Sequence, residues 1–310
     1  MNPAISPDKI HHLPWRAIGC ALLGLAPLLA QAKSAEEWLA EARAELTSYN
    51  FQMAEKAYAE ALERSEDLEE PLPRVRYEYA LTLWHQTPPN AGKVAEAEKV
   101  FRGLTEAAPE SAIGKMSRLN LSRIAVLRDF PGDAQRIEEG RRLLEPLLEG
   151  DPANRLTHEA ALRYAEAHGM EVGNEASIRK GVEFLEDWLR RFPDNPFASA
   201  AWQFLSDQYQ FGLEQPVDAH RSLRNAYKLG FVNPSAAGRY LWKLARLSSE
   251  NMDRPDYTVE YLKAIIRETP TSGRVWEARR WLMRIKERES AFADMEIPPM
   301  PTLGQEDARR

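Results

Sequence analysis

Apolar residues recur with a helical period along almost the whole chain, from residue 34 to residue 288. In the stretch 198–212, for example, Trp202, Leu205 and Tyr209 are spaced at i, i+3 and i+7 and therefore share one helix face, which we expect to be buried. Short loops containing proline and glycine separate such stretches, and no convincing run shows the period of two that a half-buried strand would have. The pattern predicts an all-α fold.

The predicted helices repeat along the chain. A small residue recurs in every second helix at steps of 43, 43, 41, 38 and 39 residues, with a large residue four positions later and an apolar residue three positions after that. The small positions are Ala54, Ala97, Gly140, Gly181, Ala219 and Thr258; the large ones are Tyr58, Phe101, Leu144, Leu185, Leu223 and Leu262; the third set is Ala61, Leu104, Leu147, Trp188, Ala226 and Ile265. In four copies a helix-ending proline follows, at Pro109, Pro152, Pro193 and Pro270. Helix pairs of this kind cannot cover their apolar faces alone, so we expect neighbouring pairs to stack.

These positions resemble the tetratricopeptide repeat, whose consensus has Trp, Leu, Gly and Tyr in the first helix and Ala, Phe, Ala and Pro in the second. In the fifth unit the first-helix positions are occupied by Trp202, Leu205, Ser206 and Tyr209. Trp38 and Trp242 open the first and sixth units in the same register. Several steps exceed the family's 34 residues, with the extra residues in loops such as 86–93, and the first helices of the third and fourth units are poorly marked.

The resemblance implies a right-handed α-solenoid of about six helix-turn-helix units over residues 33–289, closed by a C-terminal capping helix. We expect this last helix to bury Trp276, with Trp281 as a second buried candidate. Residues 290–310 lose the helical spacing and are predicted to form a flexible, proline-containing tail.

The first 32 residues differ from the rest of the chain. Arg16 precedes an uninterrupted apolar run that ends at Ala30, and residues 30–32, Ala-Gln-Ala, have the small-x-small pattern of a signal peptidase site. The run is short for a membrane span. We interpret residues 1–32 as a signal peptide cleaved after Ala32, which predicts a secreted protein or one in the periplasm of a Gram-negative bacterium, with no membrane span in the mature chain. An uncleaved membrane anchor is the alternative.

Composition and motifs exclude several functional classes. The net charge of −6 argues against a general nucleic-acid binder, which would need a positive surface. The only cysteine, Cys20, lies in the predicted signal peptide, and the chain has no phosphate-binding loop or nucleophile motif. We expect the remaining histidines to be surface or half-buried packing residues, at His85, His158, His168 and His220. The prediction is a protein that is not an enzyme and has no cofactor or metal, and an enzyme or enzyme accessory acting on cell-wall glycan is the alternative.

The resemblance also implies a binding surface, because proteins of this family hold a protein or peptide partner in a concave groove lined by first helices. In the second unit the groove positions are Tyr77, Leu81 and Trp84, with His85 beside them; in the fifth and sixth they are Gln203, Asp207, Gln210 and Lys243, with Tyr240 nearby. The alternative for Tyr77 and Trp84 is packing against the loop that follows them. The expected role is a scaffold in the bacterial envelope, of the kind that supports envelope assembly, polysaccharide export or secretion.

Overall fold

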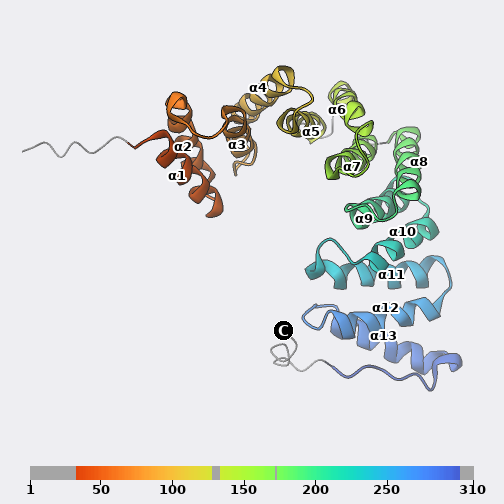
Figure 1. The fold of residues 1–310 in the computed structure, drawn as a ribbon. Coiled ribbons are helices and arrows are strands. Elements are labelled where there is room, and N and C mark those ends of the chain that lie inside the picture. Colours follow the sequence, from red (N-terminus) through yellow and green to blue (C-terminus); the bar gives the residue numbers. More distant parts are fainter. Residues whose placement is uncertain (1–32, 128–132, 172, 301–310) are drawn as a thin grey trace, which may run out of the picture.

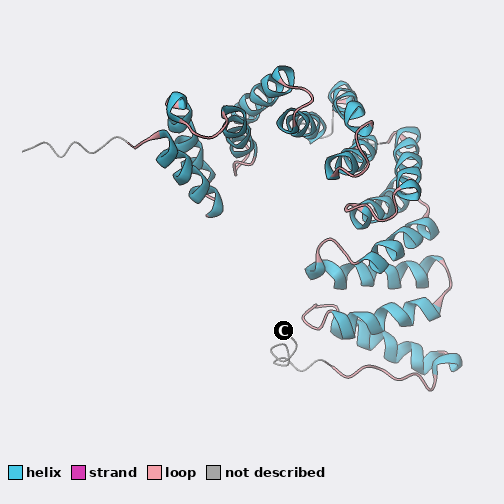
Figure 2. Ribbon diagram, viewed as in Figure 1, coloured by secondary structure: helices cyan, strands magenta, loops and turns pink. Residues whose placement is uncertain are grey.

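The computed structural model describes residues 33–127, 133–171 and 173–300 (Figure 1). Within these ranges the chain forms thirteen α-helices and a few single turns of 3-10 or π type, and it has no strand (Figure 2). The helices are α1 (Ala35–Thr47), α2 (Phe51–Glu63), α3 (Leu72–Trp84), α4 (Ala91–Ala107), α5 (Ala112–Leu127), α6 (Ala134–Leu148), α7 (Arg155–Gly169), α8 (Glu175–Arg191), α9 (Ala198–Asp207), α10 (Pro216–Leu229), α11 (Ala237–Asn251), α12 (Pro255–Glu268) and α13 (Val275–Arg288). The predicted all-α class is confirmed for the described residues. The predicted signal segment 1–32 and residues 301–310 lie outside them.

The helices stack in chain order into a curved array. Each helix packs against the next one, and α3, α5, α7 and α9 also contact one another in succession. Figure 1 shows α3, α5, α7 and α9 on the inner side of the curve and α4, α6 and α8 on its outer side. This repeat-like arrangement fits an α-solenoid. None of the helices described has both the length and the apolar character that crossing a membrane would require.

The repeated sequence positions form the core between the helices. All six small positions, all six large positions and all six third positions of the repeat are buried. The two glycines among them permit close approach: a Cβ atom at Gly140 would lie 2.6 Å from Cγ2 of Val126, and one at Gly181 would lie 2.7 Å from Cβ of His168. The small residues therefore set the distance between the two helices of a pair, as the spacing predicts.

Local signals place the helix ends. Ser34 begins α1 in a capping box with Glu37, and asparagine or aspartate side chains accept hydrogen bonds from the first turns of α4, α6, α7 and α8. The four repeat prolines lie within four residues of the ends of α4, α6, α8 and α12, where a missing N–H and a fixed φ oppose a further turn. Helix boundaries are therefore encoded within a few residues of each end.

The stretch 198–212 differs from its prediction in two respects. Leu205 and Tyr209 are buried as expected, but Trp202 is only half-buried, because it lies between two core clusters and neither covers it fully. The α-helix also stops at Asp207 and continues as one wider π turn, η2 (Gln208–Gly212). This turn keeps Tyr209 buried, with its hydroxyl 2.8 Å from Oε1 of Glu186. The wider turn leaves Phe211 exposed at the edge of the array.

The prediction that α13 buries Trp276 is wrong. Trp276 is 66% exposed, because the face of α13 that packs against α12 carries Val275, Ala278, Leu282 and Ile285 instead. Trp281 is half-buried, and its ring centroid lies 5.3 Å from that of Trp242. Residues 290–300 also differ from the expected flexible tail, since Met295 and Pro298 are buried against the last helices.

Candidate functional site

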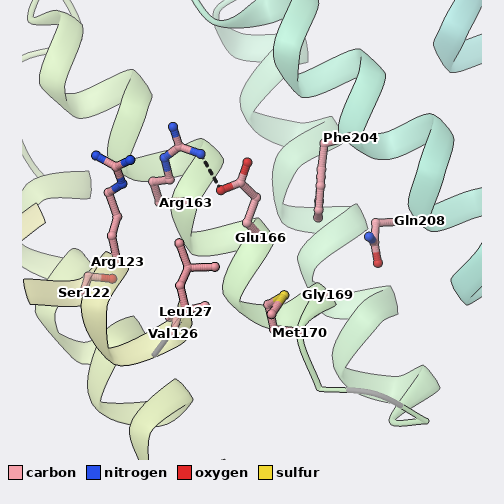
Figure 3. Close-up of a pocket in the computed structure, with 10 residues that line it drawn as sticks. All are labelled: Ser122, Arg123, Val126, Leu127, Arg163, Glu166, Gly169, Met170, Phe204 and Gln208. Carbon is pink, nitrogen blue, oxygen red and sulfur yellow. Dashed lines mark hydrogen bonds and ion pairs between the residues drawn. The ribbon is translucent and has the colours of Figure 1, made fainter. Parts of the chain in front are cut away.

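The inner side of the array contains a cavity of about 340 Å³ between α5, α7 and α9 (Figure 3). Its apolar wall comes from Val126, Leu127, Met170 and Phe204, one or two from each helix. Leu127 is 57% exposed and forms the accessible part of this apolar wall. The polar lining comes from Ser122, Arg123, Arg163, Glu166 and Gln208. A concave, mainly apolar surface with a few polar groups is the usual form of a binding site.

Arg123 lies at one edge of this cavity and links it to the second unit. Its guanidinium carbon is 4.7 Å from the ring centroid of Trp84, a cation–π contact between α5 and α3. One Nη1–H donates to Oδ1 of Asn120 at 3.3 Å, and within the described part of the chain Arg123 makes no ion pair. Burial and the nearby charge of Arg163 lower the pKa of Arg123, although an arginine stays protonated at neutral pH. Arg123 therefore presents a charged donor group that an acceptor on a ligand would stabilise.

Arg163 and Glu166 form the second polar element of the cavity, on α7. Arg163 donates to Oε2 of Glu166 at 2.6 Å and also lies 3.5 Å from Glu159 (Figure 3). Burial acts to lower the pKa of Arg163, but these two carboxylates outweigh it and raise the pKa above its ordinary value. Among the residues that the structure describes, Nε of Arg163 is buried and has no hydrogen-bond partner. The charge of Arg163 is thus largely neutralised by the two glutamates. The pair therefore shapes the cavity wall and adds little net charge to it.

The predicted groove residues of the second unit lie together on α3 and at its end. Tyr77, Leu81 and Trp84 are half-buried and His85 is exposed. The Tyr77 hydroxyl accepts a hydrogen bond from Nδ2 of Asn120 at 2.9 Å. Tyr77 and Trp84 thus face α5. The alternative considered from the sequence was that they pack against the loop that follows α3. Burial raises the pKa of the Tyr77 hydroxyl.

The predicted residues of the fifth and sixth units form a separate group. Lys243 makes an ion pair with Asp207 at 2.7 Å, which joins α11 to α9. The Gln203 side chain donates back to the carbonyl of Ser199 on its own helix, and Oε1 of Gln210 is buried with no hydrogen-bond partner among the described residues. The Tyr240 ring is tilted against Phe231, with centroids 4.8 Å apart, rather than turned toward the other predicted residues. A smaller cavity of about 230 Å³ is lined by both Gln210 and Lys243.

None of the nine predicted residues lines the cavity between α5, α7 and α9, which lies between the two predicted groups. The prediction missed it because the first helices of the third and fourth units were poorly marked in the sequence. A usable signal was nevertheless present: shifting Tyr77 and Trp84 by the repeat step of 43 residues gives Asn120 and Leu127. Asn120 bonds Tyr77, and Leu127 lines the cavity.

Three of the four histidines that follow residue 32 are buried, whereas the sequence predicted surface or half-buried positions. His158 accepts a hydrogen bond from the indole N–H of Trp188 at 3.1 Å and is 2.7 Å from the carbonyl of Pro152, so both ring nitrogens have partners. His168 contacts Ser177, and His220 packs between tyrosine rings. No group of three or more metal-ligating side chains occurs among the residues that the structure describes.

Comparison of the chain with protein-family models finds no matching model, and comparison with curated proteins finds no match.

Proposed function

We propose that this chain is a tetratricopeptide-like scaffold of the bacterial envelope that binds an extended segment of a partner protein along its inner surface. In this proposal the thirteen helices form about six helix-turn-helix units of a right-handed solenoid, and α13 is the capping helix. The observation that carries the proposal is the apolar cavity between α5, α7 and α9, with Leu127 exposed in its wall and Arg123 at its edge.

The cavity and its surroundings suit a peptide better than a small polar ligand. An apolar side chain of the partner would contact Leu127, Met170 and Phe204, while Arg123 would donate to a carbonyl or carboxylate of the same segment. Tyr77 and Trp84 on one side and the Lys243–Asp207 pair on the other extend the surface along the first helices. Aromatic and arginine side chains of this kind commonly dominate binding energy at interfaces.

Leu127→Asp tests the cavity directly. We expect peptides selected by the wild-type chain from a random short-peptide library to bind this variant at least about tenfold more weakly, because a carboxylate in an apolar wall must be desolvated on binding. Fluorescence anisotropy with a labelled selected peptide measures the change. Leu229→Asp is the matched control, since Leu229 is 53% exposed but does not line the cavity.

Equal binding by both variants would place the peptide elsewhere on the surface. Selection of no peptide at all, together with binding of cell-wall glycan fragments, would favour the alternative function.

The proposed location makes a separate prediction. If residues 1–32 act as a signal peptide, the protein recovered from the periplasm or medium begins at Lys33. Intact-mass measurement of the recovered protein decides this. A product that retains residues 1–32 would contradict cleavage and favour the membrane anchor.

A further inference from the structure

No α-helix follows α13 in the described part of the chain, and an extended segment lies along α13 in the place of one (Figure 1). We call residues 293–300 the C-terminal strap. Met295 is 9% exposed and Pro298 is buried, while Ile297 and Met300 pack partly buried against the core of the last helices. The strap therefore covers apolar surface that the end of a helical stack would otherwise expose to water.

Two cations of α13 hold the backbone of the strap. Nη1 of Arg279 donates to the carbonyl oxygen of Pro298 at 2.7 Å, and Nζ of Lys286 donates to that of Met295 at 2.9 Å. Within the residues described, neither cation forms an ion pair with a carboxylate. Hydrogen bonds from charged donors are stronger than neutral ones. Both cations thus bind backbone carbonyl oxygens, which a segment of any sequence would offer.

The spacing of these contacts matches an extended proline-containing chain. Residues seven apart on a helix are separated by about 10.5 Å along its axis. Three residues of polyproline II span about 9.3 Å. The adjacent Pro298 and Pro299 favour that conformation and carry no backbone N–H that burial would leave unpaired.

The strap is recognised in the way that a bound peptide is recognised. Its contacts are apolar side chains in the core and backbone carbonyls on two cations, and it contributes no helix or strand of its own. It is joined to α13 by only a short turn, η4 (Ser290–Phe292). A short tether gives an effective concentration on the order of millimolar, so even weak intrinsic affinity keeps such a segment bound.

We infer that the strap-covered face of α13 is a binding site for an extended, proline-containing segment, and that the chain's own strap occupies this site. A segment of the same chemistry from another molecule binds there only when the strap has left. The site is separate from the inner cavity, because neither Arg279 nor Lys286 lines that cavity. Binding at the inner cavity and binding at the strap-covered face of α13 can therefore be tested independently.

Met295→Asp in the full chain tests the inference, because it places a charge in the buried part of the strap and leaves α13 unchanged. The probe is a fluorescent synthetic peptide with the wild-type sequence of residues 290–300. We expect this variant to bind the peptide at least about tenfold more tightly than the wild-type chain, whose site is occupied. Fluorescence anisotropy measures the two affinities.

Two control variants sharpen the result. Glu296→Ala alters an exposed strap residue, so it should bind the peptide as weakly as the wild type does. Adding Arg279→Gln and Lys286→Gln to Met295→Asp should weaken peptide binding by about tenfold or more, because the charged donors to both carbonyl oxygens are replaced by neutral ones.

Equal peptide affinity of the wild type and Met295→Asp, or no binding to a Met295→Asp chain of unchanged helical content, would overturn the inference. Self-association of that variant without peptide binding would also overturn it, since a second copy would then cover the face. If the variant loses helical content, limited proteolysis of the wild type decides the matter: cleavage in the strap that leaves α13 intact supports a separable ligand, and cleavage of the strap only together with α13 overturns it.

Discussion

Replacing Phe101 with alanine is expected to lower the free energy of unfolding by about 3–5 kcal/mol. Phe101 is fully buried between α3, α4 and α5, where it packs with Leu83 and Ile124 and supports the Tyr77 ring at a centroid distance of 5.6 Å. Truncation removes this burial and leaves a cavity that rigid helices fill only in part. Urea unfolding followed by far-UV circular dichroism measures the loss.

Trp276→Ala is the control for this prediction. It removes an even larger side chain, yet we expect the stability to change by no more than about 0.5 kcal/mol, because Trp276 is mainly exposed. In a stack where units contact mainly their neighbours, the Phe101 effect should also be confined to the helices around α4. A comparable loss for Trp276→Ala would mean that α13 packs in the register predicted from the sequence rather than in the one described here.

The core of the array could be predicted because its positions depend on local spacing. Tyr58, Phe101 and Leu262 recur at a fixed offset from a small residue, and each is buried. Helix periodicity needs only the chain nearby to place such residues on one face. Trp276 was misplaced because the consensus position of a tryptophan outweighed the pattern beside it. Val275 lies on the same face as the later core residues of α13 and identifies the true register.

The cavity and the strap could not be predicted in the same way. The cavity brings Leu127, Met170 and Phe204 together from three different units, so its existence depends on how neighbouring pairs rotate against one another. No single helix carries that information. The strap has no period at all, and its docking depends on Arg279 and Lys286, which the sequence offers only as two of many charged residues. Sites between units require the packed structure.

Acid is expected to destabilise the fold through His220, by about 2 kcal/mol between pH 7 and pH 5. His220 is 2% exposed and packs between the rings of Tyr257 and Tyr261, and within the described part of the chain its Nε2 has no hydrogen-bond partner. Burial, assisted by the charges of Arg224 and Arg254, lowers its pKa to about 4. An unfolded histidine has a pKa of about 6.5.

The sign follows from these two values. Between pH 6.5 and pH 4 the unfolded chain binds a proton at His220 that the folded chain does not. The free energy of unfolding therefore decreases as the pH falls through this range, and the contribution of neutral His220 is fully present only above pH 6.5. Burial also lowers the pKa of His168, which acts in the same direction.

His220→Gln removes the titrating group, so its urea-unfolding free energy should depend less on pH than that of the wild type. His85→Gln is the control: partial burial and the charge of Arg123 also lower the pKa of His85, but the shift at His220 is the larger one, so this replacement should leave most of the pH dependence in place. Parallel stability curves for the wild type and His220→Gln between pH 7 and pH 5 would show that His220 is protonated equally in the folded and unfolded chains, and that the ring is therefore accessible to water in solution.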